Sequence, residues 1–286
     1  MTLIVGGDSF VGRATADYLE QQEVAVVRTT RRGSGVGARI IYLDLARRLE
    51  GWEPPPGVRG ACICAGAARL SECADDPTGT AWINVHQTLE LVDLLVRREI
   101  FVVFLSTNQV FDGSRAHVPP GTPHSPVSEY GRQKAATERR LMREIDNAAP
   151  VAILRLTKVV AGSMPLIEQW RTSLRARRTI SAFSDMQLAP VPVDVVAQSI
   201  GALLSAREPG IYQLSGPEDV SYLDLARLLA QRVGAGAWLV NETTAAQAGL
   251  PVGATPSHTT LDSSTLEALH GIVVPAVDKL VASRFV

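Results

Sequence analysis

The feature that most constrains the fold of this chain is a glycine-rich turn close to its start. Residues 3–5 are apolar, as in a buried strand, and helical spacing of apolar residues runs from 10 to 22. Between them lie Gly6, Gly7, Asp8, Ser9, Phe10, Val11 and Gly12. A strand, a glycine turn and a helix N-terminus direct backbone N–H groups to one point, which suits a pyrophosphate. An ordinary strand-to-helix turn is the alternative, but the position on a first βαβ unit favours a dinucleotide.

The first half of the chain alternates apolar runs with helical patterns. Further strands are expected at residues 24–27, 40–43, 61–64, 101–105 and 151–156, and further helices at 80–98 and 128–145. Unbroken Val, Ile and Leu runs between helices are typical of a parallel sheet covered on both faces. The sequence therefore predicts an α/β fold with a doubly wound parallel sheet of the Rossmann type.

The second half of the chain is less regular. Helical patterns occur at residues 165–177, 193–205 and 221–234, a short strand at 210–214, and two short helices around Pro275. Ser221 or Asp219 is a candidate N-cap for the third of these helices. We expect a nucleotide-binding domain over residues 1–160, and mainly a small C-terminal substrate lobe over 161–286, with 191–210 returning to the first domain. Residues 54–56 and 117–120 are expected to be surface loops.

Composition excludes several classes of protein. The net charge is −1, so no overall field favours nucleic acid or an anionic membrane. The start lacks the pattern of a signal peptide, and no apolar run reaches the roughly 18 residues of a membrane helix. Three cysteines argue against a disulfide framework, and neither they nor the five histidines complete a zinc spacing. Free thiols, with Cys62 and Cys64 on one face of a strand, indicate a reducing, cytoplasmic setting.

The second expected strand indicates which dinucleotide binds. An acid that bonds the adenosine ribose normally ends this strand, but here the chain continues with Arg28, Arg31 and Arg32. Arginines suit a 2′-phosphate, so NADP is favoured over NAD, although a solvated basic loop is the alternative. Asp44, followed by Leu45, comes directly after the third strand and is placed to bond the adenine amino group or to cap a helix.

Tyr130 and Lys134 are the candidate catalytic pair. Their spacing of four places both side chains on one face of the expected helix. A tyrosine with a pKa near 10 is a poor acid–base catalyst at neutral pH, and a nearby ammonium is expected to lower that pKa. The fifth strand ends with Ser106 and Thr107, whose hydroxyls are expected in the same crevice, beyond the carboxyl ends of the strands.

Taken together, these motifs resemble the extended short-chain dehydrogenase/reductase family, and within it the dTDP-4-dehydrorhamnose reductase branch of nucleotide-sugar enzymes. The resemblance spans nearly the whole chain. It rests on the glycine turn, Cys64-Ala65-Gly66-Ala67, Asn84-Val85, Ser106-Thr107, Val110-Phe111-Asp112-Gly113, Tyr130 with Lys134, and residues 210–216.

The resemblance implies roles for individual residues. Thr107 is the catalytic hydroxyl, Tyr130 the proton donor and Lys134 its partner, which also holds the nicotinamide ribose. Residues that would line the cofactor are Gly6, Ser9, Phe10, Val11, Gly12, Arg31, Arg32, Asp44, Leu45, Ala65, Gly66, Ala67 and Lys134. Asn84 either steadies the site through its helix or is only structural.

The chain departs from the branch at several positions. Ser9 replaces the middle glycine of the turn, where its hydroxyl could reach a phosphate. Asn108 and Gln109 stand where the branch has Asp and Tyr, and cannot supply the acid–base pair of the related dehydratases. Lys158 stands where the branch has a sugar-contacting Trp, and either contacts an anionic substrate group or is a surface lysine. Arg155 is expected to be a structural ion-pair partner rather than a ligand.

The predicted function is therefore NADP-dependent reduction, or epimerisation, of a 4-keto nucleotide sugar, with Asn108, Gln109 and Lys158 as substrate contacts. A non-catalytic NADP-binding regulatory or partner subunit is the alternative. A homodimer is an open expectation.

Overall fold

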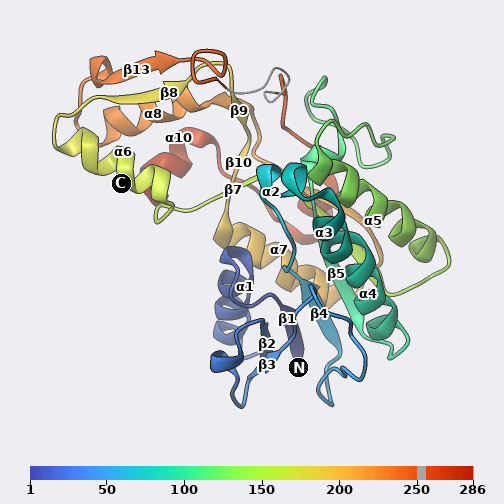
Figure 1. Ribbon diagram of the computed structural model, residues 1–286. Helices are drawn as coiled ribbons and strands as arrows, with labels where there is room; N and C mark the ends of the chain where they lie inside the picture. The colour runs from blue at the N-terminus through green and yellow to red at the C-terminus, as the bar shows by residue number, and fades with distance from the viewer. Residues whose placement is uncertain (250–255, 286) are drawn as a thin grey trace.

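Seven parallel strands form the central sheet of the computed structural model, which describes residues 1–249 and 256–285 (Figure 1). The strand order is β11-β6-β5-β4-β1-β2-β3. The strands are β1 (Thr2–Val5), β2 (Val26–Thr30), β3 (Ile40–Tyr42), β4 (Gly60–Ile63), β5 (Phe101–Thr107), β6 (Val151–Leu156) and β11 (Gly210–Leu214). The predicted doubly wound parallel sheet is confirmed. The order reverses between β1 and β4, so a crevice opens beyond their carboxyl ends.

Helices cover both faces of this sheet. On one face lie α1 (Phe10–Gln21) and α7 (Val193–Ala206), which pack on each other. In addition, α1 packs on β1 and β2, and α7 packs on β4 and β5. The other face carries α2 (Leu70–Asp75), α3 (Pro77–Ala81), α4 (Thr88–Val96) and α5 (Glu129–Asp146) (Figure 1). All the residues of β1, β4, β5 and β6 are buried, as the unbroken apolar runs predicted.

Two elements differ from their expected bounds in ways that matter for the site. The strand expected at residues 24–27 lies at Val26–Thr30, because β-branched Thr29 and Thr30 continue the ladder beside β3. The helix expected at 80–98 is α3 and α4 joined by a π-helical segment, η2 (Trp82–Gln87). Such π segments often occur at functional sites, and this one contains Asn84.

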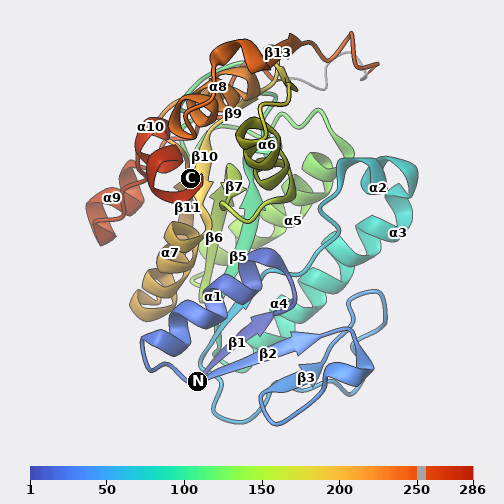
Figure 2. The ribbon, with the colours of Figure 1, turned by 90° about the vertical axis from the view of Figure 1, so that its left-hand side faces the viewer.

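The second half of the chain builds a smaller lobe above the carboxyl ends of the strands (Figure 2). Its helical parts are α6 (Pro165–Arg175), α8 (Tyr222–Arg232), η4 (Ala237–Leu239), α10 (Val277–Leu280) and η5 (Val281–Phe285). Three two-stranded sheets, not expected from the sequence, pair β7 (Lys158–Val160) with β10 (Pro190–Pro192), β8 (Ile180–Phe183) with β13 (Val240–Thr243), and β9 (Gln187–Leu188) with β12 (Val220–Ser221). Their core is separate from those of the main sheet, and includes Trp170, Leu229 and Phe285.

Two polar residues before α8 have different roles. Ser221 is the N-cap of α8, because its hydroxyl accepts from the backbone N–H of Asp224. Asp219 instead accepts from the backbone N–H groups of Thr259 and Thr260. It thereby ties the segment before α9 (Ser264–His270) to the end of β11. The two short helices expected around Pro275 are α9 and α10.

The stretch 117–120 is not a simple surface loop. Val118 is buried and forms a β-bridge with Leu261, and the carbonyl of Pro120 accepts a bond from the side chain of Arg155. The sequence-based expectation was wrong here because prolines signal a break in regular structure but do not indicate what the loop covers. Among the described residues, no helix is long and apolar enough to cross a bilayer.

The end of the chain packs closely on the start of α6, and this packing can be tested. A Cβ on Gly162 would overlap the backbone carbonyl of Arg284, which cannot move without displacing the buried Phe285. We expect Gly162→Ala to reduce the free energy of unfolding by about 1–3 kcal/mol, measured by urea denaturation. Gly121→Ala is the matched control, since a Cβ there meets nothing within 4 Å. Equal stability of the two variants would contradict this packing.

Candidate cofactor and catalytic site

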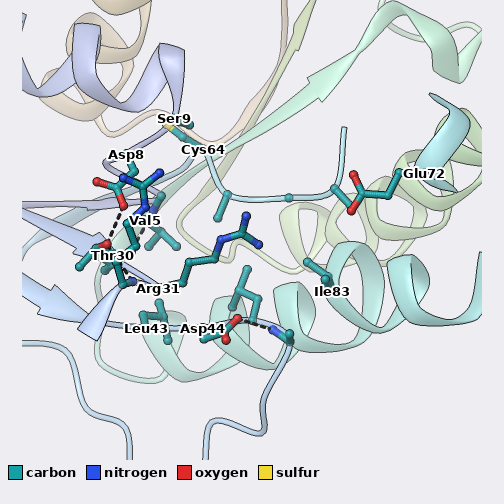
Figure 3. A pocket seen from close by; sticks show the side chains of 18 residues that line it. Val5, Asp8, Ser9, Thr30, Arg31, Leu43, Asp44, Cys64, Glu72 and Ile83 are labelled. Atoms are coloured by element: carbon teal, nitrogen blue, oxygen red, sulfur yellow. Dashed lines mark hydrogen bonds between the residues drawn. The ribbon is translucent and has the colours of Figure 1, made fainter. Parts of the chain in front are cut away.

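A pocket of about 300 Å³ opens at the carboxyl ends of β1, β2, β3 and β4 (Figure 3). It is lined by Val5, Gly6, Asp8, Ser9, Thr29, Thr30, Arg31, Arg32, Leu43, Asp44, Leu45, Ala46, Cys64, Ala65, Gly66, Ala67, Glu72 and Ile83. Nine of the thirteen residues predicted to line the cofactor are among them: Gly6, Ser9, Arg31, Arg32, Asp44, Leu45, Ala65, Gly66 and Ala67. These nine residues thus lie together around one pocket, and their role in cofactor binding stays a prediction.

The glycine turn allows the close backbone approach on which the pocket depends. Gly6 has a φ of +81°, and a Cβ there would lie 2.7 Å from the backbone nitrogen of Ala65. A Cβ on Gly12 would overlap the carbonyl oxygen of Gly6. Ser9 is the N-cap of α1, since its Oγ accepts from Gly12 N at 3.0 Å. The Ser9 hydroxyl, which the sequence placed near a phosphate, therefore stabilises the start of α1.

Charges of both signs meet at the end of β2. Arg31 and Arg32 line the pocket, and Figure 3 shows the side chain of Arg31 extending across it. The carboxylate of Asp8 accepts the Thr30 hydroxyl at 2.5 Å. The sequence reasoning missed this carboxylate because it comes from the glycine turn and not from β2.

Asp44 lines the pocket but is not a helix N-cap. Its carboxylate faces the pocket and accepts from the backbone N–H of Ala46 at 3.0 Å, but no helix follows. It therefore stabilises the turn after β3, and remains within the pocket wall.

Asn84 holds one wall of the pocket in place. Its side-chain oxygen accepts from Ala67 N, and its amide nitrogen donates to Ala67 O, both at 2.8 Å. The same amide nitrogen lies 2.8 Å from Oε1 of Gln133 on α5. Only 1% of Asn84 is exposed, so these bonds form away from water. Asn84 thus connects the cofactor pocket to the helix that carries Tyr130 and Lys134. Gln133 was missed because a polar residue on a helix gives no sequence signal of burial.

The hydroxyl of Thr107 lies at the end of β5, beside the start of α5. Its Oγ1 accepts from Gln109 N at 3.2 Å and lies 3.4 Å from Oδ1 of Asn108. Gln109 accepts from the hydroxyl of Ser128, the N-cap of α5, at 2.9 Å. The side chain of Gln109 is therefore engaged in positioning α5. Ser106, in contrast, is buried, and its hydroxyl has no hydrogen-bond partner among the described residues.

Lys134 and Tyr130 lie on one face of α5, but not with the expected electrostatic effect. Nζ of Lys134 donates to the carbonyl of Leu105 at 2.8 Å and lies 4.4 Å from the centre of the Phe104 ring. Burial lowers the pKa of Lys134 to about 8, against the opposing effect of Glu138. The pKa of Tyr130 is raised by burial and by Cys73. The expectation that Lys134 lowers the tyrosine pKa is wrong for this arrangement, because the ammonium is directed to Leu105.

The remaining predicted residues lie elsewhere. Phe10 is 44% exposed at the start of α1, and neither it nor Val11, Gly12 or Lys134 lines the pocket. Lys158 is exposed at the start of β7, directly beyond β6, and forms no salt bridge with the described residues. Arg155 is fully buried and paired with Glu138 at 2.7 Å, which confirms the structural reading.

The chain belongs to the family described as "RmlD substrate binding domain". The model of that family matches residues 1–284. A probable low-salt glycan biosynthesis reductase of Haloferax volcanii is 27% identical over 222 residues, which cover 75% of this chain and 73% of that protein. A dTDP-4-keto-6-deoxy-D-glucose reductase of Streptomyces niveus is 26% identical over 235 residues, covering 82% and 78%.

Solved structures share the fold at low identity. A dTDP-4-dehydrorhamnose reductase of Bacillus anthracis, in complex with NADP, has a TM-score of 0.82 and 17% identity, covering 99% of this chain and 98% of that one. An orthologous reductase of Clostridium acetobutylicum has a TM-score of 0.80 and 17% identity, covering 99% and 97%. The resemblance to the reductase branch of the short-chain dehydrogenase/reductases is thereby confirmed.

The amide of Asn84 can be tested as the clamp on the pocket wall. Asn84→Ala leaves the backbone N–H of Ala67 and the side-chain oxygen of Gln133 without a buried partner, while the carbonyl of Ala67 keeps the thiol of Cys73 as a donor. Each such group costs about 1–3 kcal/mol, so we expect a loss of at least about 2 kcal/mol in the free energy of unfolding. Asn147→Ala is the control, since Asn147 is exposed and bonds only to its own helix. Similar losses in urea denaturation of both variants would contradict the clamp.

Proposed function

We propose that this protein reduces a 4-keto nucleotide sugar with NADPH. The observation that carries the proposal is that Asn84 connects the pocket to the helix with the candidate catalytic pair, along one edge of the sheet. The pocket holds the glycine turn and two arginines, and Asn84 connects its wall to α5, which bears Tyr130 and Lys134. Two relatives that match most of the chain are named as reductases, which favours reduction over epimerisation.

The residues of the pocket fit NADP. The start of α1 and the backbone of Gly6 to Gly12 would hold the pyrophosphate, where Cβ atoms at Gly6 and Gly12 would close the space. Arg31 and Arg32 would bind the 2′-phosphate, and their two positive charges exceed the single charge of Asp8 beside them. Asp44 would accept from the adenine amino group. The NADP bound to the Bacillus anthracis reductase, a protein of the same fold, is consistent with this assignment.

Three side chains would act on the substrate carbonyl. NADPH, when bound, supplies a hydride to the carbonyl carbon. Thr107 donates a hydrogen bond to the carbonyl oxygen, and Tyr130 transfers its phenolic proton to that oxygen as negative charge develops. The raised pKa of Tyr130 keeps this proton on the phenol until it is needed. Lys134 would orient the nicotinamide ribose. In sum, a ketone, one hydride from NADPH and one proton from Tyr130 give an alcohol.

Three further residues are placed to contact the substrate without taking part in the proton transfer: Asn108, Gln109 and Lys158. Asn108 lies next to Thr107 and offers an amide to the sugar, whereas the side-chain oxygen of Gln109 is already bound to Ser128. Lys158 follows the end of β6 and carries an exposed charge without a salt-bridge partner among the described residues. We propose that Asn108, Gln109 and Lys158 contact the sugar nucleotide, with Lys158 bound to an anionic group.

If Arg31 and Arg32 bind the 2′-phosphate, removing them should weaken the binding of NADPH but not that of NADH. Ligand binding raises the melting temperature in step with RT ln(1 + [L]/Kd), so a thermal-shift panel of NADPH, NADH and nucleotide diphosphates reports on the site. We expect the double variant Arg31→Ala/Arg32→Ala to weaken NADPH binding at least about tenfold and to leave NADH nearly unchanged. Arg39→Ala is the control, because Arg39 is exposed and outside the pocket lining. Greater stabilisation of the wild-type protein by NADH than by NADPH would overturn the assignment.

The catalytic assignment predicts that Tyr130→Phe removes turnover but not cofactor binding. Loss of the proton donor should lower kcat/KM for a 4-keto nucleotide sugar by about 10²–10⁴, while the thermal shift with NADPH persists. Tyr18→Phe on α1 should behave as the wild-type protein. Full activity of Tyr130→Phe would exclude this role.

The alternative function, a non-catalytic partner subunit, has its own test. It would be favoured if the wild-type protein binds NADPH, oxidises none with any such sugar and co-purifies with an enzyme.

A further inference from the structure

A carboxylate lies at the end of β2, although β2 itself ends without an acid. The strand ends at Thr30, and the chain continues with Arg31 and Arg32. Asp8 reaches this place from the glycine turn, where its Oδ2 accepts from the Thr30 hydroxyl at 2.5 Å. Figure 3 shows the two side chains joined at one end of the pocket. In dinucleotide-binding sheets, an acid at the end of this strand accepts from the adenosine ribose.

The carboxylate of Asp8 is held in position but is not neutralised. Nε and Nη2 of Arg13 donate to the backbone carbonyl of Asp8 at 3.1 and 2.9 Å, so this guanidinium fixes the turn and does not bind the carboxylate. In the part of the chain that the structure describes, the side chain of Asp8 has one hydrogen bond, from Thr30, and no salt bridge. A carboxylate accepts about four hydrogen bonds. The exposed carboxylate therefore keeps acceptor positions for a ligand in the pocket.

The hydroxyl of Thr30 links this acid to the arginines that follow. It donates to Asp8 and accepts from the backbone N–H of Arg32 at 3.1 Å. Arg31 and Arg32 also line the pocket, and neither forms a salt bridge with a described residue. A carboxylate suits free ribose hydroxyls, whereas guanidinium groups suit a 2′-phosphate. One corner of the pocket thus offers an acceptor for NADH and donors for NADPH.

We propose that Asp8 sets the preference of this pocket between the two dinucleotides. Its carboxylate accepts from the ribose hydroxyls of NADH, and it repels the 2′-phosphate of NADPH that Arg31 and Arg32 attract. Both dinucleotides therefore bind, and Asp8 limits the preference for NADPH. This role rests on the proposed cofactor site, and Asp8 takes no part in the transfer of hydride or proton.

The test is the affinity of Asp8→Asn for each dinucleotide. The substitution removes the negative charge, while the amide oxygen can still accept from Thr30. NADH loses a charge-assisted hydrogen bond, so its Kd should rise about threefold. NADPH loses the repulsion of its 2′-phosphate, so its Kd should fall about threefold. The ratio of the two Kd values, measured by titration of nicotinamide fluorescence, should therefore change by about tenfold.

The opposite signs of these two changes separate a role in cofactor choice from a merely structural one. If Asp8 only stabilises the glycine turn, Asp8→Asn should weaken the binding of both dinucleotides together. Asp17→Asn is the matched control, because it removes the same charge from α1 outside the pocket lining and leaves Arg28 paired with Glu20. It should keep the wild-type ratio. Changes of the same sign in Asp8→Asn, or an unchanged ratio, would overturn the proposal.

The wild-type protein gives a second test that needs no substitution. Measurable binding of NADH beside that of NADPH is expected, and an NADPH affinity more than about a thousandfold greater would contradict an acceptor for the ribose hydroxyls. Wild-type protein that binds neither dinucleotide would refute the cofactor site, and the role of Asp8 with it. Tight binding of NADPH together with an unchanged ratio in Asp8→Asn would refute the role of Asp8 alone.

Discussion

The buried guanidinium of Arg155 is the group on which much of this structure depends. A charge removed from water must be paired and hydrogen-bonded, and an arginine has donors on three nitrogens to satisfy. Nε and Nη2 bond to Glu138, and Nη1 bonds to the carbonyl of Pro120 and to Gln213. Gln213 in turn donates to the carbonyls of Val118 and Asp262. One residue on β6 therefore fixes the position of α5, of β11 and of two long connections that carry little regular structure.

The pairing of Arg155 also fixes the helix α5, which carries the candidate catalytic residues. The face of α5 that pairs with Arg155 is the face that carries Tyr130 and Lys134, because four-residue steps on an α-helix remain on one side. The start of the same helix is held by Ser128, bonded to Gln109 just after Thr107, and by Gly131, where a Cβ would overlap the carbonyl of Gln109. The start of the helix is thus held against the segment after β5, and its middle is held by the pairing of Glu138 with Arg155 on β6.

Much of the fold, and the grouping of nine predicted residues around one pocket, followed from local sequence patterns. The glycine turn, the apolar strands and the four-residue spacing on α5 depend on neighbouring residues, so they are readable without tertiary structure. Three contacts of the site join segments that lie 17 to 22 residues apart in sequence. They are the bond of Asp8 to Thr30 at the end of β2, the bonds of Asn84 to Ala67, and the pairing of Glu138 with Arg155. Polar residues at such positions usually face solvent, so sequence alone gives no reason to bury them. The π-helical segment that contains Asn84 was not predicted either, because the apolar pattern indicated one continuous helix there.

Buried and exposed charges lie in different parts of the candidate site. On the inward face of α5, Glu138 is bonded to Arg155 and His124 and Lys134 to the carbonyl of Leu105, so a substitution there disturbs buried partners. Lys158 lies at a strand end on the surface, and the side chain of Asn108 is bonded only to the neighbouring Thr107 among the described residues. Lys158 is exposed and has no salt bridge among the described residues, so its ammonium is available to an anionic group. In the proposed function, substrate preference is therefore expected to depend on charge at Lys158, and the hydride and proton transfers on Thr107, Tyr130 and Lys134.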